Sequence, residues 1–351
     1  MKKRVLVAMS GGVDSSVTGW LLKEQGYECI GATMRLHESA LHDDVSDAAS
    51  VADKLGIPFH VLDFRKEFSE LVKDDFAAVY ARGDTPNPCI QCNRYLKFGK
   101  LLEAAEELGC DCIATGHYAR IAQLPSGRWA LRKGAEAARD QSYFLSLLTQ
   151  LQLSKVLFPL ADVPKAEVRR IAEEQGFVSA RKRDSQDICF VPDGDYVGFL
   201  EEYTRQTYDP GPVYHTDGRL LGQHRGAIRY TLGQRKGLGV SAGEPVYVCG
   251  KFMAENTVYV GPERELFKGA LIAEEFVWGA IGGIDAPLRC KARVRYRHTE
   301  QPAVAEALED GRVKVTFDEP QRAITAGQAV ALYDGDTVLG GGMITKVLEN
   351  A

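Results

Sequence analysis

The sequence lacks any apolar run long enough to span a bilayer, and its Met-Lys-Lys-Arg start leads directly into a strand-like segment instead of a secretory leader. Internal repeats and low-complexity tracts are absent too. Its eight cysteines are scattered over 351 residues, unlike the dense framework of a small disulfide-bonded domain. We therefore expect a cytoplasmic protein of two or three domains, with reduced thiols and no membrane contact.

An excess of basic residues is also missing, since the formal net charge is −5 at pH 7. This balance excludes indiscriminate nucleic-acid binding but allows a local basic face. Residues 291–297 predict such a basic face, because four alternating cations would lie on one side of a strand and could bind phosphates. These cations are Lys291, Arg293, Arg295 and Arg297. The alternative is a solvated edge strand whose charges prevent aggregation. The runs 225–236 and 181–183 are further basic candidates.

The Gly-Lys-Ser/Thr ending of the common triphosphate-binding loop does not occur. Instead, an apolar strand over residues 5–9 runs into Ser-Gly-Gly-Val-Asp-Ser at residues 10–15, which opens a helix. Two glycines let backbone N–H groups close on a phosphate chain, hydroxyls add donors, and the positive end of the helix faces the ligand. The pattern predicts an ATP-binding loop.

Strand and helix patterns alternate through the first half of the chain, which predicts an α/β fold with a doubly wound parallel sheet. Strands are expected over 5–9, 29–34, 59–62 and 112–115, helices over 13–25, 45–55, about 63–80, 95–108 and 164–175, and a hairpin over 120–133. Beyond about residue 209, Asp-Gly turns separate short β-branched runs. They predict two small all-β modules with a boundary near residues 265–271.

Cys92 lies where a proline-rich loop is expected to enter the helix over 95–108. The helix dipole, together with Arg94 and Lys97, should lower the pKa of this thiol. Two alternatives remain: a buried cysteine at a helix start, or half of a zinc site with Cys89. The zinc site lacks a second close Cys/His pair.

Cys189 follows a basic run but is flanked by Ile188 and Phe190, so a loop-borne thiol and a core position both stay open. Packing is the expected role of five others, Cys29, Cys110, Cys112, Cys249 and Cys290.

Several motifs, taken together and in order, resemble the bacterial tRNA-specific 2-thiouridylases along the whole chain. They are Ser-Gly-Gly-x-Asp-Ser at 10–15, Thr-Pro-Asn-Pro at 85–88 with Cys92-Asn93 and Lys97-Phe98, Thr-Gly-His-Tyr at 115–118, Asp-Gln-Ser-Tyr-Phe-Leu at 140–145, Asp184-Ser185 with Ile188-Cys189-Phe190, and Tyr-Thr-Leu-Gly-Gln-Arg-Lys-Gly-Leu-Gly at 230–239. The first is similar to the loop of enzymes that split ATP between its α and β phosphates. The resemblance implies an ATP-pyrophosphatase-type catalytic domain over 1–208, helical after about 140, a small β-rich tRNA-binding domain over 209–266, and a β-barrel over 267–351.

The resemblance also implies the chemistry. ATP, with Mg²⁺, would activate the C2 oxygen of the wobble uridine as an adenylate. Cys189 would accept a persulfide sulfur from a donor protein, such as a cysteine desulfurase or a sulfur-relay protein. Cys92 would be the second thiol: it would either attack Cys189 to free hydrosulfide, forming a Cys92–Cys189 disulfide, or assist sulfur transfer to C2 and expulsion of AMP. A reductant would then reset the pair.

Binding residues follow from the same resemblance. Those implied around the nucleotide are Ala8, Met9, Ser10, Gly11, Gly12, Val13, Asp14, Ser15, Met34 and Gly116. Asp14 would aid magnesium or pyrophosphate handling, unless it only caps the helix. Those implied at the tRNA anticodon stem-loop are Asn87, Pro88, Cys89, His117, Arg139, Asp140, Gln141, Tyr296, Arg297 and Gln328. The target base must leave its stack to react.

One position departs from the family pattern, because many members carry Asp where Cys89 stands, and a cysteine cannot be assumed to do acid–base work there. Cys89, Cys92 and Cys189 are also similar to the three-cysteine iron–sulfur site of other tRNA thiolation enzymes, an alternative sulfur route. Two alternatives concern the class of protein. One is another ATP-pyrophosphatase-loop ligase, argininosuccinate- or GMP-synthetase-like, which needs no cysteine pair. The other is a nucleotide-regulated RNA-binding protein with inert cysteines.

Overall fold

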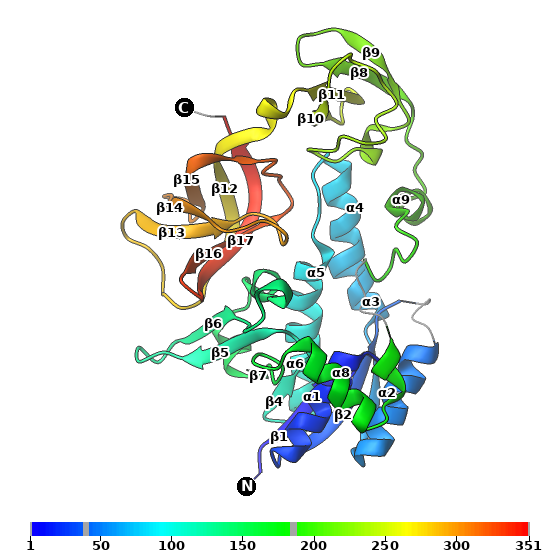
Figure 1. The fold of residues 1–351 in the computed structure, drawn as a ribbon, viewed down its shortest axis with the longest axis vertical. Helices are drawn as coiled ribbons and strands as arrows, with labels where there is room; N and C mark the ends of the chain where they lie inside the picture. Colours follow the sequence, from blue (N-terminus) through cyan, green and yellow to red (C-terminus); the bar gives the residue numbers. More distant parts are fainter. Residues whose placement is uncertain (1, 38–41, 183–187, 350–351) are drawn as a thin grey trace.

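The computed structural model describes residues 2–37, 42–182 and 188–349, which form three regions (Figure 1). Among these residues, the N-terminal region is built on a parallel sheet with the strand order β3-β2-β1-β4-β7. Its strands are β1 (Arg4–Ala8), β2 (Glu28–Arg35), β3 (Phe59–Asp63), β4 (Cys112–Ala114) and β7 (Val156–Leu157). The predicted doubly wound sheet is confirmed, and its topological switch point lies between β1 and β4.

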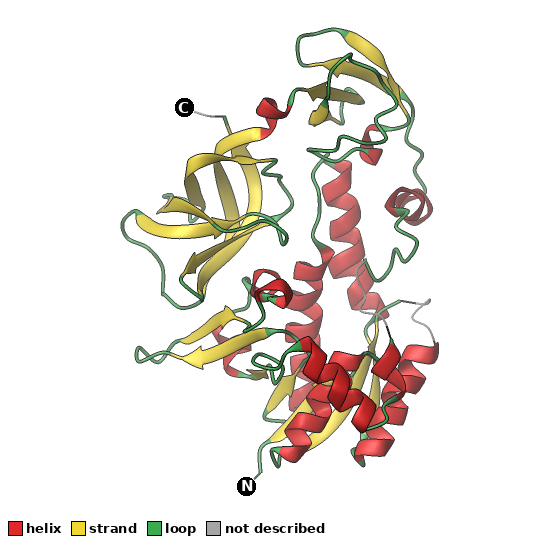
Figure 2. Cartoon of the chain, viewed as in Figure 1, coloured by secondary structure: helices red, strands yellow, loops and turns green. Residues whose placement is uncertain are grey.

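Helices cover both faces of this sheet (Figure 2). The helices of the N-terminal region, including those away from the sheet, are α1 (Val13–Glu24), α2 (His42–Leu55), α3 (Arg65–Phe68), η1 (Ser69–Lys73), α4 (Asp74–Ala81), α5 (Pro88–Gln91), η2 (Cys92–Lys100), α6 (Leu101–Glu107), η3 (Ala137–Arg139), η4 (Ser142–Leu145), α7 (Gln150–Ser154), α8 (Lys165–Glu174), η5 (Val178–Arg181) and α9 (Tyr196–Thr204). In β1, Val5 and Val7 pack against α1, α2 and α8, whereas Leu6 packs against η2 and α6. This alternation is the two-residue period of a strand buried on both faces. Among the described residues, no helix combines the length and apolar character that crossing a membrane requires.

Two all-β regions follow. The central region carries a sheet of order β10-β11-β8-β9, and the C-terminal region is a barrel of six strands. The elements are β8 (Gly211–His215), β9 (Leu220–His224), η6 (Ala227–Arg229), β10 (Tyr247–Phe252), β11 (Thr257–Gly261), η7 (Glu263–Leu266), β12 (Phe267–Trp278), β13 (Leu288–Arg293), β14 (Gln301–Ala307), β15 (Val313–Arg322), β16 (Ala329–Asp334) and β17 (Thr337–Leu348). Strand β12 closes the barrel by pairing with both β15 and β17. The predicted succession of two all-β modules, the second a barrel, is confirmed.

A hairpin links the N-terminal region to the barrel. Strands β5 (Ala119–Gln123) and β6 (Trp129–Lys133) form the hairpin expected over 120–133. Strand β6 also pairs with β17 of the barrel, through Arg132 and Thr337, so the barrel sheet continues into the N-terminal region.

Two local predictions are wrong. The helix expected from residue 95 begins at Pro88, which suits a first helical turn, and it runs through η2 into α6 without a break. The strand expected to carry four cations ends at Arg293, at the end of β13. Arg295 lies beyond that strand, half-buried, and hydrogen-bonds the Thr325 hydroxyl. The four cations therefore do not form one continuous basic face.

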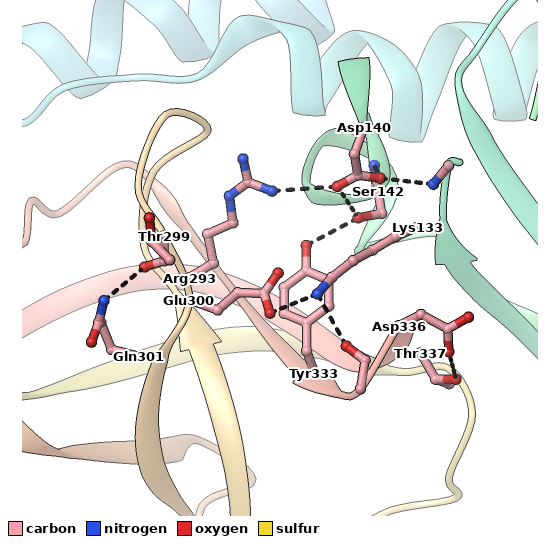
Figure 3. Close-up of polar contacts among 12 residues, drawn as sticks. Lys133, Asp140, Ser142, Arg293, Thr299, Glu300, Gln301, Tyr333, Asp336 and Thr337 are labelled. Atoms are coloured by element: carbon pink, nitrogen blue, oxygen red, sulfur yellow. Dashed lines mark hydrogen bonds and ion pairs between the residues drawn. The ribbon is translucent and has the colours of Figure 1, made fainter. Parts of the chain in front are cut away.

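A buried carboxylate joins the N-terminal region to the barrel (Figure 3). Asp140 is 4% exposed and accepts hydrogen bonds from the Gly134 N–H at 3.2 Å, the Ser142 N–H at 3.1 Å and the Ser142 hydroxyl at 2.8 Å. The Arg293 guanidinium, from the barrel, approaches the same carboxylate at 3.4 Å. Because a buried charge is costly without a partner, each side of this interface stabilises the other.

Tyr333, on the face of barrel strand β16 that packs against the N-terminal region, continues this network (Figure 3). Its hydroxyl lies 3.2 Å from the Ser142 hydroxyl, and its ring lies under the Lys133 ammonium, 4.8 Å from the ring centre. Lys133 in turn donates to Glu300 at 2.7 Å. The barrel is thus fixed to the N-terminal region by polar contacts from several elements.

Replacing Asp140 with alanine should lower the free energy of unfolding by about 3 kcal/mol, because Arg293 and two backbone amides lose a buried partner. Urea unfolding measures this change. Asp336→Ala is the matched control, since the exposed Asp336–Arg132 pair at 3.9 Å should contribute less than about 1 kcal/mol. Equal losses in the two variants would contradict the assignment.

Candidate active site

The loop between β1 and α1 is shaped to take an anion. Gly11 has a φ of 70°, and a Cβ there would lie 2.5 Å from the Asp44 carbonyl oxygen, so the position requires glycine. The Ser15 hydroxyl accepts from the Ser10 N–H at 3.2 Å and donates to the Gly12 carbonyl at 3.1 Å, which folds the loop onto α1. Gly12, the N-cap, gives no side-chain cap to the first helical turn. Those N–H groups are therefore available to a phosphate.

The other implied nucleotide residues lie at the same edge of the sheet. Met34 lies near the carboxyl end of β2, and Gly116 follows β4. A Cβ on Gly116 would lie 2.9 Å from Asp14, so the segment after β4 touches the loop after β1. The Asp14 carboxylate accepts from the Tyr118 hydroxyl at 2.6 Å and from the Lys165 ammonium at 2.7 and 2.8 Å. Asp14 is therefore part of an ion pair and not a helix cap alone.

Cys92 lies inside a continuous helix, one turn beyond its start at Pro88, and is 8% exposed. Burial raises the pKa of its thiol to about 12, a larger effect than the lowering by Lys97. The predicted lowering is wrong for two reasons. Cys92 is not at the helix N-terminus. The positive charge of Arg94 is compensated by an ion pair with Glu275 of the barrel.

Cys189 is exposed, whereas the next residue, Phe190, is buried in an aromatic cluster. The Phe190 ring centre lies 5.0 to 5.5 Å from those of Phe68, Phe76 and Phe199. Cys92 belongs to the same cluster, and the charges of Cys189 and Cys89 both act on its titration. The flanking residue is therefore the core position, and the structure brings the thiols of Cys89, Cys92 and Cys189 together without a disulfide.

The segment η2 is a π-helix, a wide turn that the residue pattern does not predict. The Gln152 side-chain amide donates to the carbonyls of Arg94 at 3.0 Å and Phe98 at 2.8 Å, and the Asn93 amide donates to the Phe144 carbonyl at 3.1 Å. The two Gln152 bonds satisfy backbone carbonyls along the widened turn, and the Asn93 bond ties this turn to η4. Such turns often occur at functional sites, but no local residue signal distinguishes this one from an α-helix.

One short segment connects the nucleotide loop to the thiol helix. Gly116 touches Asp14, and the next residue, His117, packs against the Phe98 ring of η2 with a centroid distance of 5.7 Å. Its Nδ1 lies 2.7 Å from the Thr115 hydroxyl. Burial lowers the pKa of His117 well below its ordinary value, so the imidazole is neutral at pH 7. The thiols and the phosphate-binding loop therefore lie on two sides of the same segment.

The residues implied at tRNA occupy several environments. Cys89 and Arg297 are exposed, Asn87, Arg139, Gln141, Tyr296 and Gln328 are half-buried, and Pro88, His117 and Asp140 are buried. Asn87, Pro88 and Cys89 lie at the start of the thiol helix. The buried members support the site in this conformation, and tRNA contact by the whole set stays a prediction.

Gln328 ties the barrel to the loop before the thiol helix. Its side-chain amide donates to the carbonyls of Thr85 at 2.9 Å and Pro86 at 3.0 Å. The Thr85 N–H in turn donates to the Ala326 carbonyl at 3.1 Å. The barrel therefore holds the approach to Cys89 in place.

The basic run 181–183 is partly neutralised. Lys182 forms ion pairs with Asp44 at 2.8 Å and Asp47 at 2.5 Å. Arg183 and the motif Asp184-Ser185 lie outside the described residues.

Across residues 2–37, 42–182 and 188–349, no group of three His, Cys, Asp or Glu side chains is placed to hold a single metal ion. The iron–sulfur route through Cys89, Cys92 and Cys189 stays a prediction. Asp14 offers a single carboxylate beside the phosphate loop, which fits a magnesium ion held largely by ATP phosphates.

Sequence reasoning overlooked one cation of this site, Lys165, and gave a second, Lys97, only one role. Lys165 lies at the start of α8, where it reaches Asp14, and Lys97 was considered only for its influence on Cys92. The position of Lys165 after Pro164 indicated a helix start but no link to the loop after β1, because that contact is tertiary.

The fold and the loop define a class, a nucleotide-binding HUP domain followed by two β domains. Residues 3–193 match the model of the tRNA methyl transferase HUP domain, 197–262 that of the tRNA methyl transferase PRC-barrel domain, and 268–344 that of the aminomethyltransferase beta-barrel domain.

Relatives narrow the class further. The chain is 49% identical to the tRNA-specific 2-thiouridylase MnmA of Symbiobacterium thermophilum, over 99% of this chain and 93% of that one. It is 45% identical to the protein of that name from Clostridioides difficile, over 99% of both chains, and 48% identical to that of Syntrophotalea carbinolica, over 97% and 98%. The chain therefore belongs to the tRNA-specific 2-thiouridylase family.

The thiols should differ in reactivity according to their exposure. With iodoacetamide at pH 8 and no tRNA, Cys89 and Cys189 should be alkylated at least about tenfold faster than Cys92, which is buried and, well below its pKa, protonated. Tandem mass spectrometry of the tryptic peptides gives the three rates, because fragmentation distinguishes Cys89 from Cys92 within the shared peptide 83–94. Rapid labelling of Cys92 in the folded protein would contradict this arrangement, and labelling in urea shows that the reagent reaches all three sites.

Proposed function

We propose that this protein is an ATP-dependent sulfurtransferase that replaces the C2 oxygen of the wobble uridine in tRNA with sulfur. The observation that supports it best is the meeting of Cys92 and Cys189 beside the segment that also touches the phosphate loop. The relatives, named for tRNA-specific 2-thiouridylase activity, support the same substrate. A ligase that passes nitrogen to an adenylate would not need these thiols.

Activation comes first, because a uracil carbonyl oxygen is a poor leaving group. The C2 oxygen attacks the α phosphate of ATP, and pyrophosphate leaves. The loop at residues 8–15 binds the phosphates through backbone N–H groups, and a magnesium ion bound there would neutralise phosphate charge. Lys165, 7% exposed at its side chain, sets the position of Asp14 at this loop.

Sulfur then passes through Cys189. Its thiolate attacks the terminal sulfur of a donor persulfide, a new S–S bond forms, and the donor thiolate leaves. The exposure of Cys189 suits this exchange with a visiting donor protein.

Transfer to the base needs the second thiol. The terminal sulfur attacks C2 and AMP leaves. The Cys92 thiolate then attacks Cys189 Sγ, the electron pair of the persulfide bond goes to the sulfur on C2, and a Cys92–Cys189 disulfide forms. A thiol reductant restores both cysteines. Cys92 requires a nearby cation or a changed environment to act as a thiolate, because burial holds its pKa at about 12.

Cysteine substitutions test this route. With ATP, unmodified tRNA and an active persulfide donor, wild-type protein should give tRNA whose mass rises by one sulfur-for-oxygen exchange. Cys92→Ser and Cys189→Ser should each slow the exchange by at least about a thousandfold, since each removes a reacting atom. Cys249→Ser, in the central region, should stay within about twofold.

Three outcomes would change the proposal. No exchange with wild-type protein would count against thiolation, and full activity of Cys92→Ser would favour a ligase. If anaerobically purified wild-type protein contains iron and the Cys89→Ala variant does not, the result would favour the iron–sulfur route.

The nucleotide site is tested at Gly116. An added Cβ would lie 2.9 Å from Asp14, so Gly116→Ala should displace the loop and weaken ATP binding by about tenfold or more, measured by calorimetry. Gly282→Ala is the control, because its Cβ would meet nothing closer than 3.9 Å. Unchanged ATP affinity in Gly116→Ala would place the nucleotide elsewhere.

A further inference from the structure

Lys97 shares one side of the thiol helix with Cys92 because of the π-helical turn. The two positions are five apart in the sequence, and in an α-helix such residues lie about 140° apart around the axis. In a π-helix, hydrogen bonds run from each residue to the fifth residue along, which brings positions five apart close to alignment. Both residues belong to η2, so the wide turn places the Lys97 ammonium on the side of the thiol.

The charge of Lys97 reaches every reactive group of this site. Desolvation by surrounding residues raises the pKa of all three thiols, those of the exposed Cys89 and Cys189 as well as that of the buried Cys92, and Lys97 acts in the opposite direction on each. It also adds to the effect of burial in lowering the pKa of His117. The three thiols lie on two separate segments of the chain. Because the charge of Lys97 acts on all three, Lys97 lies near the place where these segments converge.

Lys97 has no counter-ion among the described residues, unlike its neighbours on the same helix. Arg94 pairs with Glu275, and Lys100 pairs with Glu103 at 2.7 Å. Lys97 is half-buried and makes no ion pair or hydrogen bond with the segments of the chain that the structure describes. The half-buried Lys97 side chain therefore leaves a charge that no carboxylate of the described residues compensates, and this charge can attract an incoming anion.

We propose that Lys97 binds the anionic terminal sulfur of the Cys189 persulfide and holds it between Cys189 and Cys92. This inference rests on the proposed function and adds a residue to it. Lys97 forms no covalent bond: it stabilises the negative sulfur until that sulfur attacks C2, when the charge leaves with AMP. His117 is neutral, so it does not compete with Lys97 for the anionic sulfur. After sulfur transfer, the Lys97 ammonium lies beside the Cys92 thiolate that must form.

Variants that remove or keep the positive charge at residue 97 distinguish binding of the anionic sulfur from a packing role of the side chain. Lys97→Met and Lys97→Gln should slow single-turnover sulfur transfer from persulfide-loaded protein by about a hundredfold, while pyrophosphate release and tRNA affinity stay within about threefold. Lys97→Arg should recover at least about a tenth of the wild-type rate, because it keeps the charge. Since removal of a cation makes a sulfur less acidic, the rate profile of the neutral variants should move to higher pH. Lys100→Met, on the same helix, is the matched control and should behave as wild type.

The outcomes distinguish this inference from the proposed function. If wild-type protein transfers sulfur and Lys97→Met does so equally fast, Lys97 does not bind the sulfur. If wild-type protein transfers none, the proposed function fails, and iodoacetamide then decides the role of Lys97: alkylation of Cys189 at pH 8 should be about tenfold slower in Lys97→Met, and an unchanged rate would overturn the inference. Loss of folding in both neutral variants, seen by circular dichroism, would make Lys97 a structural residue and also overturn it.

Discussion

The candidate site depends on the burial of Phe190. Cys189 and Cys92 are distant in sequence, and they meet because the ring next to Cys189 lies within an aromatic cluster that also contains Cys92. Burying a phenylalanine contributes about 1.5–3 kcal/mol, and its edge contacts with Phe68 and Phe76 add to this. The anchoring free energy therefore comes from the neighbouring ring and not from the thiol. Cys189 can thus be fixed in place and still stay open to solvent.

The parallel sheet supplies the second half of the arrangement. Strands β1 and β4 are neighbours, so the phosphate loop after β1 and the segment after β4 must meet at one edge of the sheet. Gly116 makes the contact because a larger residue would collide with Asp14, and His117 turns to pack on the thiol helix. Two kinds of chemistry, phosphoryl activation and sulfur transfer, are therefore separated by the width of a single segment. The barrel fixes the opposite end through Gln328.

The features that sequence predicted are those set by local residues. Apolar runs, glycine turns and proline positions indicated the sheet, the phosphate loop, the hairpin and the all-β modules, and the family motifs pointed to Cys92 and Cys189. The errors arose where distant residues decide. The wide turn of η2 is held by Gln152, the end of β13 coincides with the contact of Arg293 to Asp140, and the pKa of Cys92 is set by a cluster assembled from separate helices.

Charge compensation explains why basic residues in the sequence are a poor guide to RNA-binding surfaces in this protein. Arg293, Lys182 and Arg94 each pair with a carboxylate, so their charges are largely satisfied before any phosphate arrives. A phosphate that recruited such a cation would have to compete with an existing ion pair, and the gain would be correspondingly smaller. Lys97 differs because no carboxylate of the described residues pairs with it, and the groups that its charge influences are neutral thiols and a neutral imidazole. An anion that enters there meets an uncompensated charge, and the attraction is stronger in a partly desolvated site than in water.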